Sequence, residues 1–156
     1  MKAGIFTRQG VIDCYEVDMP EKKQSEVLIR TLRASICGSD LHVGYCGWGV
    51  DDFPLPPGFP GHESVCEVVD GEGTNYVENQ LVLAVPIIPD ARSFSEYQVI
   101  PESQLIKIGD SISMNEMLMA QQLGTVIFAL RKLPDLSGQS VVIIGQGSAG
   151  LFHTFM

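Results

Sequence analysis

Hydrophobic residues in the first two thirds of the chain fall in short runs that glycine, proline, asparagine or aspartate separate. The run EVLIRTLRASI alternates on Leu28, Leu32, Ala34 and Ile36, which is the period of a strand with one buried face. Further runs of this kind are SVCEVVD, LVLAVPII, FSEYQVI and LIKI. Many short strands bounded by turn residues predict a mainly β fold up to about residue 110, as a barrel or a rolled sheet.

The pattern changes after Asp110. Ser113 and Glu116 have the spacing of a capping box, which marks the start of a helix. The segment NEMLMAQQLGTVIFALRKL then predicts a helix that ends before Pro134 and that Gly124 can interrupt. We therefore expect a first domain over residues 1–112 and a second part over residues 113–156.

A third pattern lies in the last sixteen residues, VVIIGQGSAGLFHTFM. The β-branched run 141–144 predicts a buried strand, and Gly145, Gly147 and Gly150 form the turn G-x-G-x-x-G that cradles a dinucleotide pyrophosphate. Ser148 is expected to begin a helix. A parallel sheet needs further strands and helices to cover this strand, and none follow, so we expect its apolar edge to be left unpaired.

Charge and cysteine content narrow the class of protein. The net charge of −9 disfavours nucleic acid and anionic membranes as partners, because both attract cationic surfaces. No uncharged apolar run is long enough to span a bilayer. The cysteines show no C-x-x-C pair and indicate reduced thiols of a cytoplasmic protein: Cys14, Cys37, Cys46 and Cys66.

Two short segments gather side chains that bind metals and protons. SICGSDLH ends a predicted strand, and PGHES follows a loop too rich in glycine and proline for regular structure. Their polar residues are Cys37, Ser39, Asp40, His42, His62 and Glu63. Thiolate and imidazole are usual Zn²⁺ ligands, and carboxylates hold a ligating histidine in place. A small buried cysteine and a hydrogen-bonded core histidine are the alternatives to a metal site.

The order ICGSDLH, GHE and then an apolar strand with a glycine turn resembles the zinc-containing medium-chain dehydrogenase/reductase family, the alcohol and polyol dehydrogenases. The resemblance extends along essentially the whole chain. It implies a GroES-like β-barrel that holds a catalytic zinc, followed by a helix and the first strand and turn of an incomplete Rossmann α/β domain. The chain would then be the amino-terminal portion of such a dehydrogenase, inactive or nearly so by itself.

The same resemblance implies a set of metal ligands. Cys37 and His62 would ligate the zinc, Glu63 would lie at the metal or against its ligands, and Asp40 would orient His62. Gln121 takes the place of a glutamate that polyol-dehydrogenase-like members use, and it either binds the zinc through its weaker carbonyl oxygen or simply lies on the helix. A second, structural zinc is not expected, because the segment LAVPIIPDARSFSEY lacks the family's cysteines.

The remaining implied roles concern protons and cofactor. Ser39 and His42 would carry the alcohol proton to solvent, and the glycines at 145, 147 and 150 would hold NAD(P). Trp48 and Phe53 either line a pocket for a small alcohol substrate or plug the mouth of the barrel. We also expect a homo-oligomer that assembles through the apolar C-terminal segment.

Two other functions fit parts of the pattern. One is a GroES-like module that binds a metal or a partner without redox chemistry. Zinc binding without affinity for a dinucleotide would indicate this module. The other is that of the zinc-free quinone reductases, although Cys37, His62 and Glu63 would then have no shared purpose.

Overall fold

The computed structural model describes residues 1–109 and 111–156; Asp110, after which the sequence pattern changes, lies outside the described residues. Compactness divides the chain into two units, Met1–Leu118 and Met119–Met156. The domain boundary after residue 112 stays a prediction. Among the described residues, no helix has both the length and the apolar character that a membrane crossing requires.

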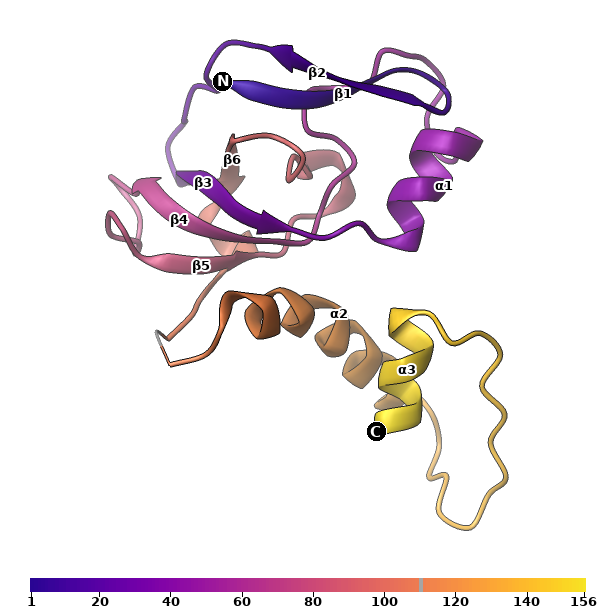
Figure 1. Cartoon of the computed structure of the whole chain (residues 1–156). Coiled ribbons are helices and arrows are strands. Elements are labelled where there is room, and N and C mark those ends of the chain that lie inside the picture. The colour runs from indigo at the N-terminus through magenta and orange to yellow at the C-terminus, as the bar shows by residue number, and fades with distance from the viewer. Residues whose placement is uncertain (110) are drawn as a thin grey trace. The chain divides into compact units, whose positions relative to one another are not determined.

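The first unit is mainly β, as the sequence predicts (Figure 1). Its larger sheet is antiparallel, in the order β6-β3-β4-β5-β7, and curls into a half-barrel. The strands are β3 (Glu26–Ala34), β4 (Ser64–Asp70), β5 (Leu81–Ala84), β6 (Tyr97–Pro101) and β7 (Leu105–Lys107). A separate hairpin pairs β1 (Lys2–Arg8) with β2 (Val11–Glu16). The short helices are α1 (Gly38–Cys46), η1 (Ile88–Asp90) and η2 (Glu102–Gln104).

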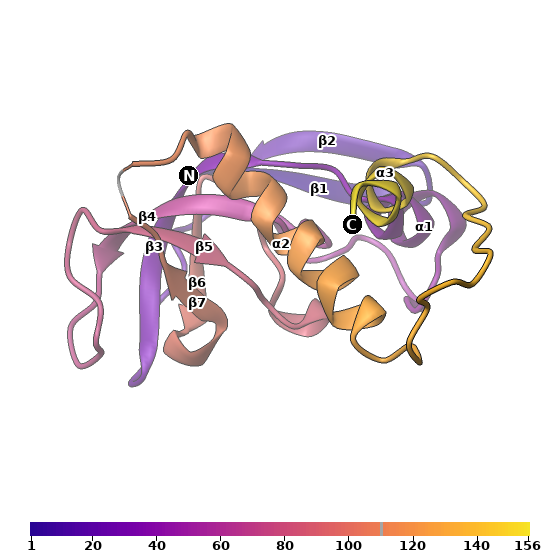
Figure 2. The same ribbon diagram turned by 90° about the horizontal axis from the view of Figure 1, so that it is seen from below.

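The core of this unit forms on one face of the curled sheet. All of its strands contribute to a cluster of buried side chains: Val27, Ile29, Cys66, Val68, Val82, Ala84, Ile100 and Leu105. A second apolar contact lies against β4 and β5, where Met117 and Leu118 from the start of α2 (Met114–Leu130) pack on Val65 and Leu83. Figure 2 shows the ribbon of α2 running past β5. Apolar packing on both faces therefore holds the sheet in place without a contribution from the candidate site residues.

The predicted inward face of β3 is wrong. Val27 and Ile29 are fully buried, whereas Leu28 and Leu32, which we placed on the buried face, are only half-buried and Ala34 is exposed. Ile36 lies beyond the end of β3 and is 71% exposed. Val27 lies opposite Ile100 on β6 and Ile29 lies opposite Val68 on β4, so cross-strand packing selects the odd-numbered face. The local pattern misled because three apolar residues in a row at 27–29 fit either face, and only the neighbouring strands decide between them.

The helices differ in how well the sequence predicted them. The capping box of α2 is confirmed: the N–H of Ser113 donates to the carboxylate of Glu116, and the N–H of Glu116 donates to the Ser113 hydroxyl. Gly124 does not interrupt α2, which continues to Leu130. Helix α1 was not predicted, because the interpretation of this segment rested on its polar residues.

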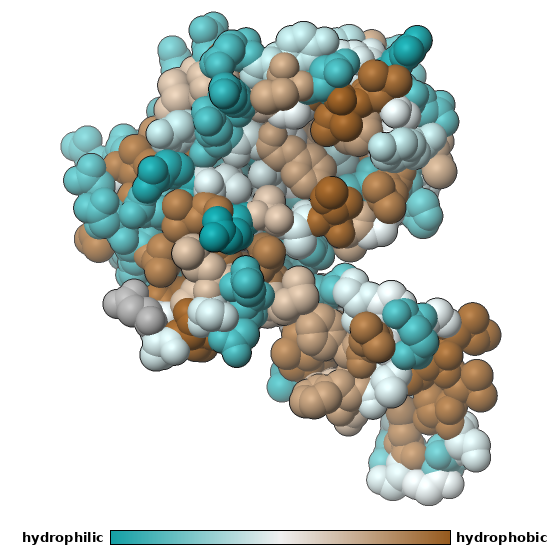
Figure 3. Space-filling model, in the orientation of Figure 1, coloured by the Kyte–Doolittle hydropathy of each residue, from teal (hydrophilic) through white to brown (hydrophobic). Residues whose placement is uncertain are grey.

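In the second unit, the predicted buried strand at 141–144 is absent. No strand is assigned there, and Val142 and Ile144 are 84% and 96% exposed. A parallel strand forms only when neighbouring strands accept and donate its backbone hydrogen bonds, and the described residues of this unit supply none. The helix expected from Ser148 is confirmed as α3 (Ser148–Phe155). Apolar side chains are exposed over this part of the chain (Figure 3).

The burial in this segment can be tested by truncating the buried isoleucine of β3 and the exposed isoleucine that follows the strand. We expect Ile29→Ala to lower the free energy of unfolding by about 2–5 kcal/mol, because it opens a cavity in the core. The matched change Ile36→Ala should alter it by less than about 0.5 kcal/mol, because that side chain already contacts water. Urea denaturation measures both. A larger loss for Ile36→Ala than for Ile29→Ala would mean that position 36, rather than position 29, lies in the core.

Candidate metal centre

The two motifs meet because β3 and β4 run antiparallel. Ala34 at the end of β3 pairs with Ser64 at the start of β4. Cys37 lies three residues beyond Ala34, and His62 and Glu63 directly precede Ser64, so all three emerge at the same end of this strand pair. The sheet therefore brings together segments that are 25 residues apart in the sequence.

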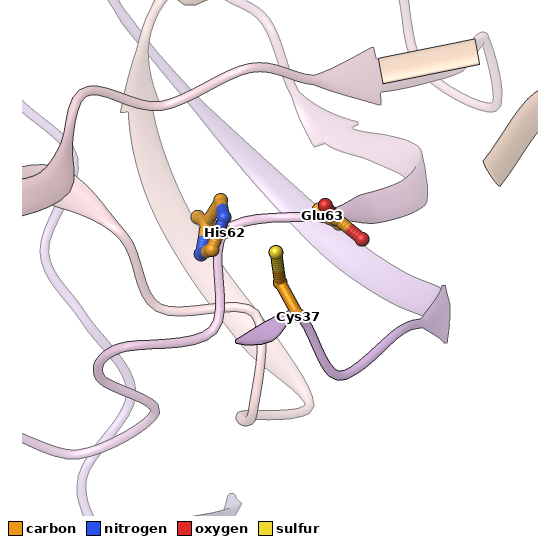
Figure 4. A group of neighbouring side chains, drawn as sticks. All are labelled: Cys37, His62 and Glu63. Carbon is orange, nitrogen blue, oxygen red and sulfur yellow. The ribbon is translucent and has the colours of Figure 1, made fainter. Parts of the chain in front are cut away.

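Three potential ligand atoms converge at this end. The Sγ of Cys37, a ring nitrogen of His62 and a carboxylate oxygen of Glu63 all lie within 4.8 Å of one another. The sulfur of Cys37 points into the space between the imidazole and the carboxylate (Figure 4). His62 and Glu63 are buried, at 8% and 3% exposure, and Cys37 is half-buried. The convergence that the sequence predicts for these three residues is present.

Asp40 ties the thiol segment to the imidazole. It lies in the first turn of α1 and is 2% exposed. Its Oδ2 accepts a hydrogen bond from the backbone N–H of Cys37 at 2.7 Å, and its Oδ1 lies 2.9 Å from Nδ1 of His62. This hydrogen bond is the main reason that the pKa of His62 is raised to about 9, against the opposing effect of burial. With Nδ1 held by Asp40, Nε2 is left to face the cluster.

Glu63 is a buried carboxylate that forms no ion pair among the described residues. The hydroxyl of Ser35 donates to its Oε2, and the backbone N–H of Ser35 donates to its carbonyl oxygen at 3.1 Å. None of the ion pairs among residues 1–109 and 111–156 includes Glu63. The nearby imidazole of His62 is already paired with Asp40. Burying a charge without a counter-charge of its own is costly, so the Glu63 carboxylate indicates a place for a cation beside Cys37.

The donor set fits a zinc ion. One sulfur, one nitrogen and one oxygen are the donor types that Zn²⁺ binds, with bond lengths of about 2.0–2.3 Å. Donors at such distances from a tetrahedral ion lie about 3.3–3.8 Å apart, so a contraction of the observed cluster by about 1 Å is enough to enclose one. Three protein ligands would leave a fourth position free, as in catalytic zinc sites.

Ser39 and His42 lie on the same helix as Asp40. The hydroxyl of Ser39 is 3.4 Å from Nε2 of His62, and His42 is exposed one turn further along α1. Residues three apart on a helix share a face. No hydrogen bond joins the two side chains in the described part of the chain. Their predicted role as a proton path stays a prediction.

A cavity of about 200 Å³ opens beside this cluster. Ser39, Asp40 and His62 line it, and its other walls are largely apolar, including Val43, Phe59 and Trp48. Trp48 therefore takes the first of its two alternatives, because it lines a pocket. Phe53 is not among the lining residues, and it packs against the apolar cluster of Phe6 and Leu55 that also includes the cavity residues Val43 and Phe59.

The other predicted site residues lie in the second unit. Gly145 has a positive φ of 95°, Gly147 caps the start of α3, and a Cβ at Gly150 would lie 2.0 Å from the carbonyl oxygen of Gly145. Only a glycine fits at 150, so the close turn of the G-x-G-x-x-G pattern is formed although the strand before it is not. Gln121 lies half-buried on α2, and its role as a zinc ligand stays a prediction.

Ser35 is a residue of this site that the sequence did not reveal. A single serine gives no local signal, because its contact with Glu63 depends on the pairing of two strands. The start of α1 did have a signal. Asp40 stands three residues after Cys37, at the spacing of a residue that caps a helix start, although cysteine is not among the preferred cap residues.

Residues 23–110 match the family model of the alcohol dehydrogenase GroES-like domain, which is more than half of the chain. The chain belongs to this family. It is 30% identical over 178 residues to L-threonine 3-dehydrogenase of Pyrococcus horikoshii, covering 97% of this chain and 51% of that enzyme. It is also 30% identical over 166 residues to L-threonine 3-dehydrogenase of Vibrio cholerae, covering 87% of this chain and 47% of that enzyme. The chain thus spans about half the length of these relatives.

Solved structures agree with the family assignment. The 2R,3R-butanediol dehydrogenase from Bacillus subtilis has a TM-score of 0.82 at 25% identity, covering 97% of this chain and 53% of that enzyme. Galactitol-1-phosphate dehydrogenase from Escherichia coli has a TM-score of 0.80 over 98% of this chain and 51% of its own, and at 21% identity it shows the fold alone. The resemblance to alcohol and polyol dehydrogenases and the GroES-like fold are both confirmed.

Proposed function

We propose that this GroES-like chain carries the catalytic metal centre of a zinc-dependent alcohol dehydrogenase. The observation that carries the proposal is the convergence of Cys37, His62 and Glu63 at one end of the β3–β4 pair. The two anionic donors, a thiolate and a carboxylate, balance the charge of Zn²⁺. The ion would also be the counter-charge of the buried Glu63 carboxylate, which forms no ion pair among the described residues.

When bound, the zinc supplies a Lewis acid that polarises the oxygen of an alcohol and lowers its pKa. Two residues of the chain are then proposed to move the proton of the alcohol. The Ser39 hydroxyl, at 3.4 Å from His62 Nε2, would accept the proton of the alcohol and release its own hydroxyl proton toward His42. His42, exposed on the same face of α1, passes that proton to solvent, a role that suits an imidazole.

The proposed oxidation also needs an acceptor for hydride. The turn at Gly145, Gly147 and Gly150 presents backbone N–H groups at the start of α3, which suits the pyrophosphate of NAD(P). When bound there, NAD(P) would supply the acceptor for the hydride that leaves the alcohol carbon. Because the chain spans about half of its relatives, this overall activity is proposed for the protein that contains the chain.

Metal binding is the first test. We expect the chain to bind one Zn²⁺, and Cys37→Ser to weaken binding by more than about 100-fold, beyond the loss typical of residues that only support a ligand. The matched control Cys46→Ser changes an exposed thiol and should leave the affinity unchanged. Competition with a chromophoric chelator measures all three proteins. Equal affinity of the two cysteine variants would contradict the proposal.

The same preparation separates the dehydrogenase from the metal-holding module. Titration of the zinc-loaded chain with NADH should show saturable binding if the glycine turn already accepts a dinucleotide. Zinc binding without any affinity for NADH would instead favour the module as the function of this chain.

A second test concerns the carboxylate that links the motifs. We expect Asp40→Asn to lower zinc affinity by about 10–100-fold, because the amide still accepts a hydrogen bond from Cys37 but no longer offers a negative charge to His62. Asp13→Asn, on the exposed part of β2, serves as the control. Calorimetric titration gives the affinities, and thermal unfolding of the metal-free proteins checks that both variants fold. An unchanged zinc affinity of Asp40→Asn would mean that Asp40 does not support metal binding.

A further inference from the structure

Ser35 makes two hydrogen bonds to the same residue, Glu63. Its backbone N–H donates to the carbonyl oxygen of Glu63 at 3.1 Å, one step beyond the pair that Ala34 forms with Ser64. Its hydroxyl donates to Oε2 of the Glu63 side chain. The strand ladder therefore fixes the backbone of Ser35 relative to Glu63, and the hydroxyl is held beside the carboxylate.

This arrangement leaves the two carboxylate oxygens different. Oε2 is engaged by the hydroxyl, whereas Oε1 accepts no hydrogen bond from the described residues. A hydroxyl that donates to one oxygen limits rotation of the carboxylate and lowers the electron density available on that oxygen. A cation beside Cys37 would then meet a carboxylate that offers one favoured donor.

We propose that Ser35 is a positioning residue, which holds Glu63 so that its carboxylate gives the metal a single oxygen. The inference rests on the proposed zinc site and adds a residue to it that acts only through Glu63. A bidentate carboxylate would occupy two positions at the metal. One oxygen preserves the open position that a substrate alcohol requires.

The burial of Glu63 supports this role. At 3% exposure the carboxylate has little access to water, so the Ser35 hydroxyl is its only side-chain hydrogen-bond donor among the described residues. Removing that hydroxyl leaves a buried carboxylate whose orientation the metal alone decides. The change should therefore appear in the coordination geometry as well as in the affinity.

Cobalt(II) in place of zinc makes the geometry visible, because its d–d absorption depends on the number and arrangement of ligands. We expect Ser35→Ala to alter the visible spectrum of the cobalt-loaded chain and to weaken metal binding by about 10-fold. Ser35→Thr retains a hydroxyl and should restore both. The control Ser137→Ala removes a hydroxyl that bonds an exposed carboxylate, that of Asp135, and should change neither.

A double-mutant cycle tests whether Ser35 acts through Glu63. In a Glu63→Gln background, Ser35→Ala should produce less than a twofold further change in affinity and no further change in the spectrum. A wild-type spectrum and affinity for Ser35→Ala would overturn the inference and leave the metal site intact. Equal effects of Ser35→Ala with and without Glu63 would also overturn it. If the unmutated chain bound no cobalt or zinc, the proposed function would fail, and this inference with it.

Discussion

The antiparallel pairing of β3 with β4 is the constraint on which the rest of the site depends. A strand pair delivers the residues beyond one strand and before the next to the same place, whatever the length of chain between them. Here the intervening segment contains α1 and a long loop rich in glycine and proline. The pair itself is held by the buried core, since Ile29 on β3 lies opposite Val68 on β4. Packing in the sheet therefore sets the distance between the thiol and the imidazole.

Two carboxylates fix the geometry at the end of the β3–β4 pair where the two motifs meet. Asp40 is shared between the start of α1 and the ring of His62, so the helix and the loop before β4 cannot shift independently. The second carboxylate, that of Glu63, accepts a hydrogen bond from the hydroxyl of Ser35. Both acids are buried, and buried anions are retained where something positive compensates them. The electrostatics of the cluster and its donor atoms thus point to the same occupant, a divalent cation.

The sequence predicted the components of the site better than their surroundings. Cys37, His62 and Glu63 were identifiable because the two short motifs that contain them, followed by a glycine turn, resemble those of the zinc-containing dehydrogenases. The buried face of β3 and the contact of Ser35 with Glu63 were not, because both depend on which strands lie alongside. The segment 141–144 has the composition of a buried strand, yet it forms none without neighbours to bond. Composition encodes a strand's preference, and pairing decides whether the strand exists.

The central claim is that one sulfur, one imidazole and one carboxylate from this chain surround a single zinc ion. X-ray absorption at the zinc edge of the loaded chain measures these ligands directly. We expect one Zn–S distance of about 2.3 Å together with nitrogen and oxygen neighbours at about 2.0–2.2 Å. A spectrum without sulfur, or with two or more sulfur ligands, would contradict it.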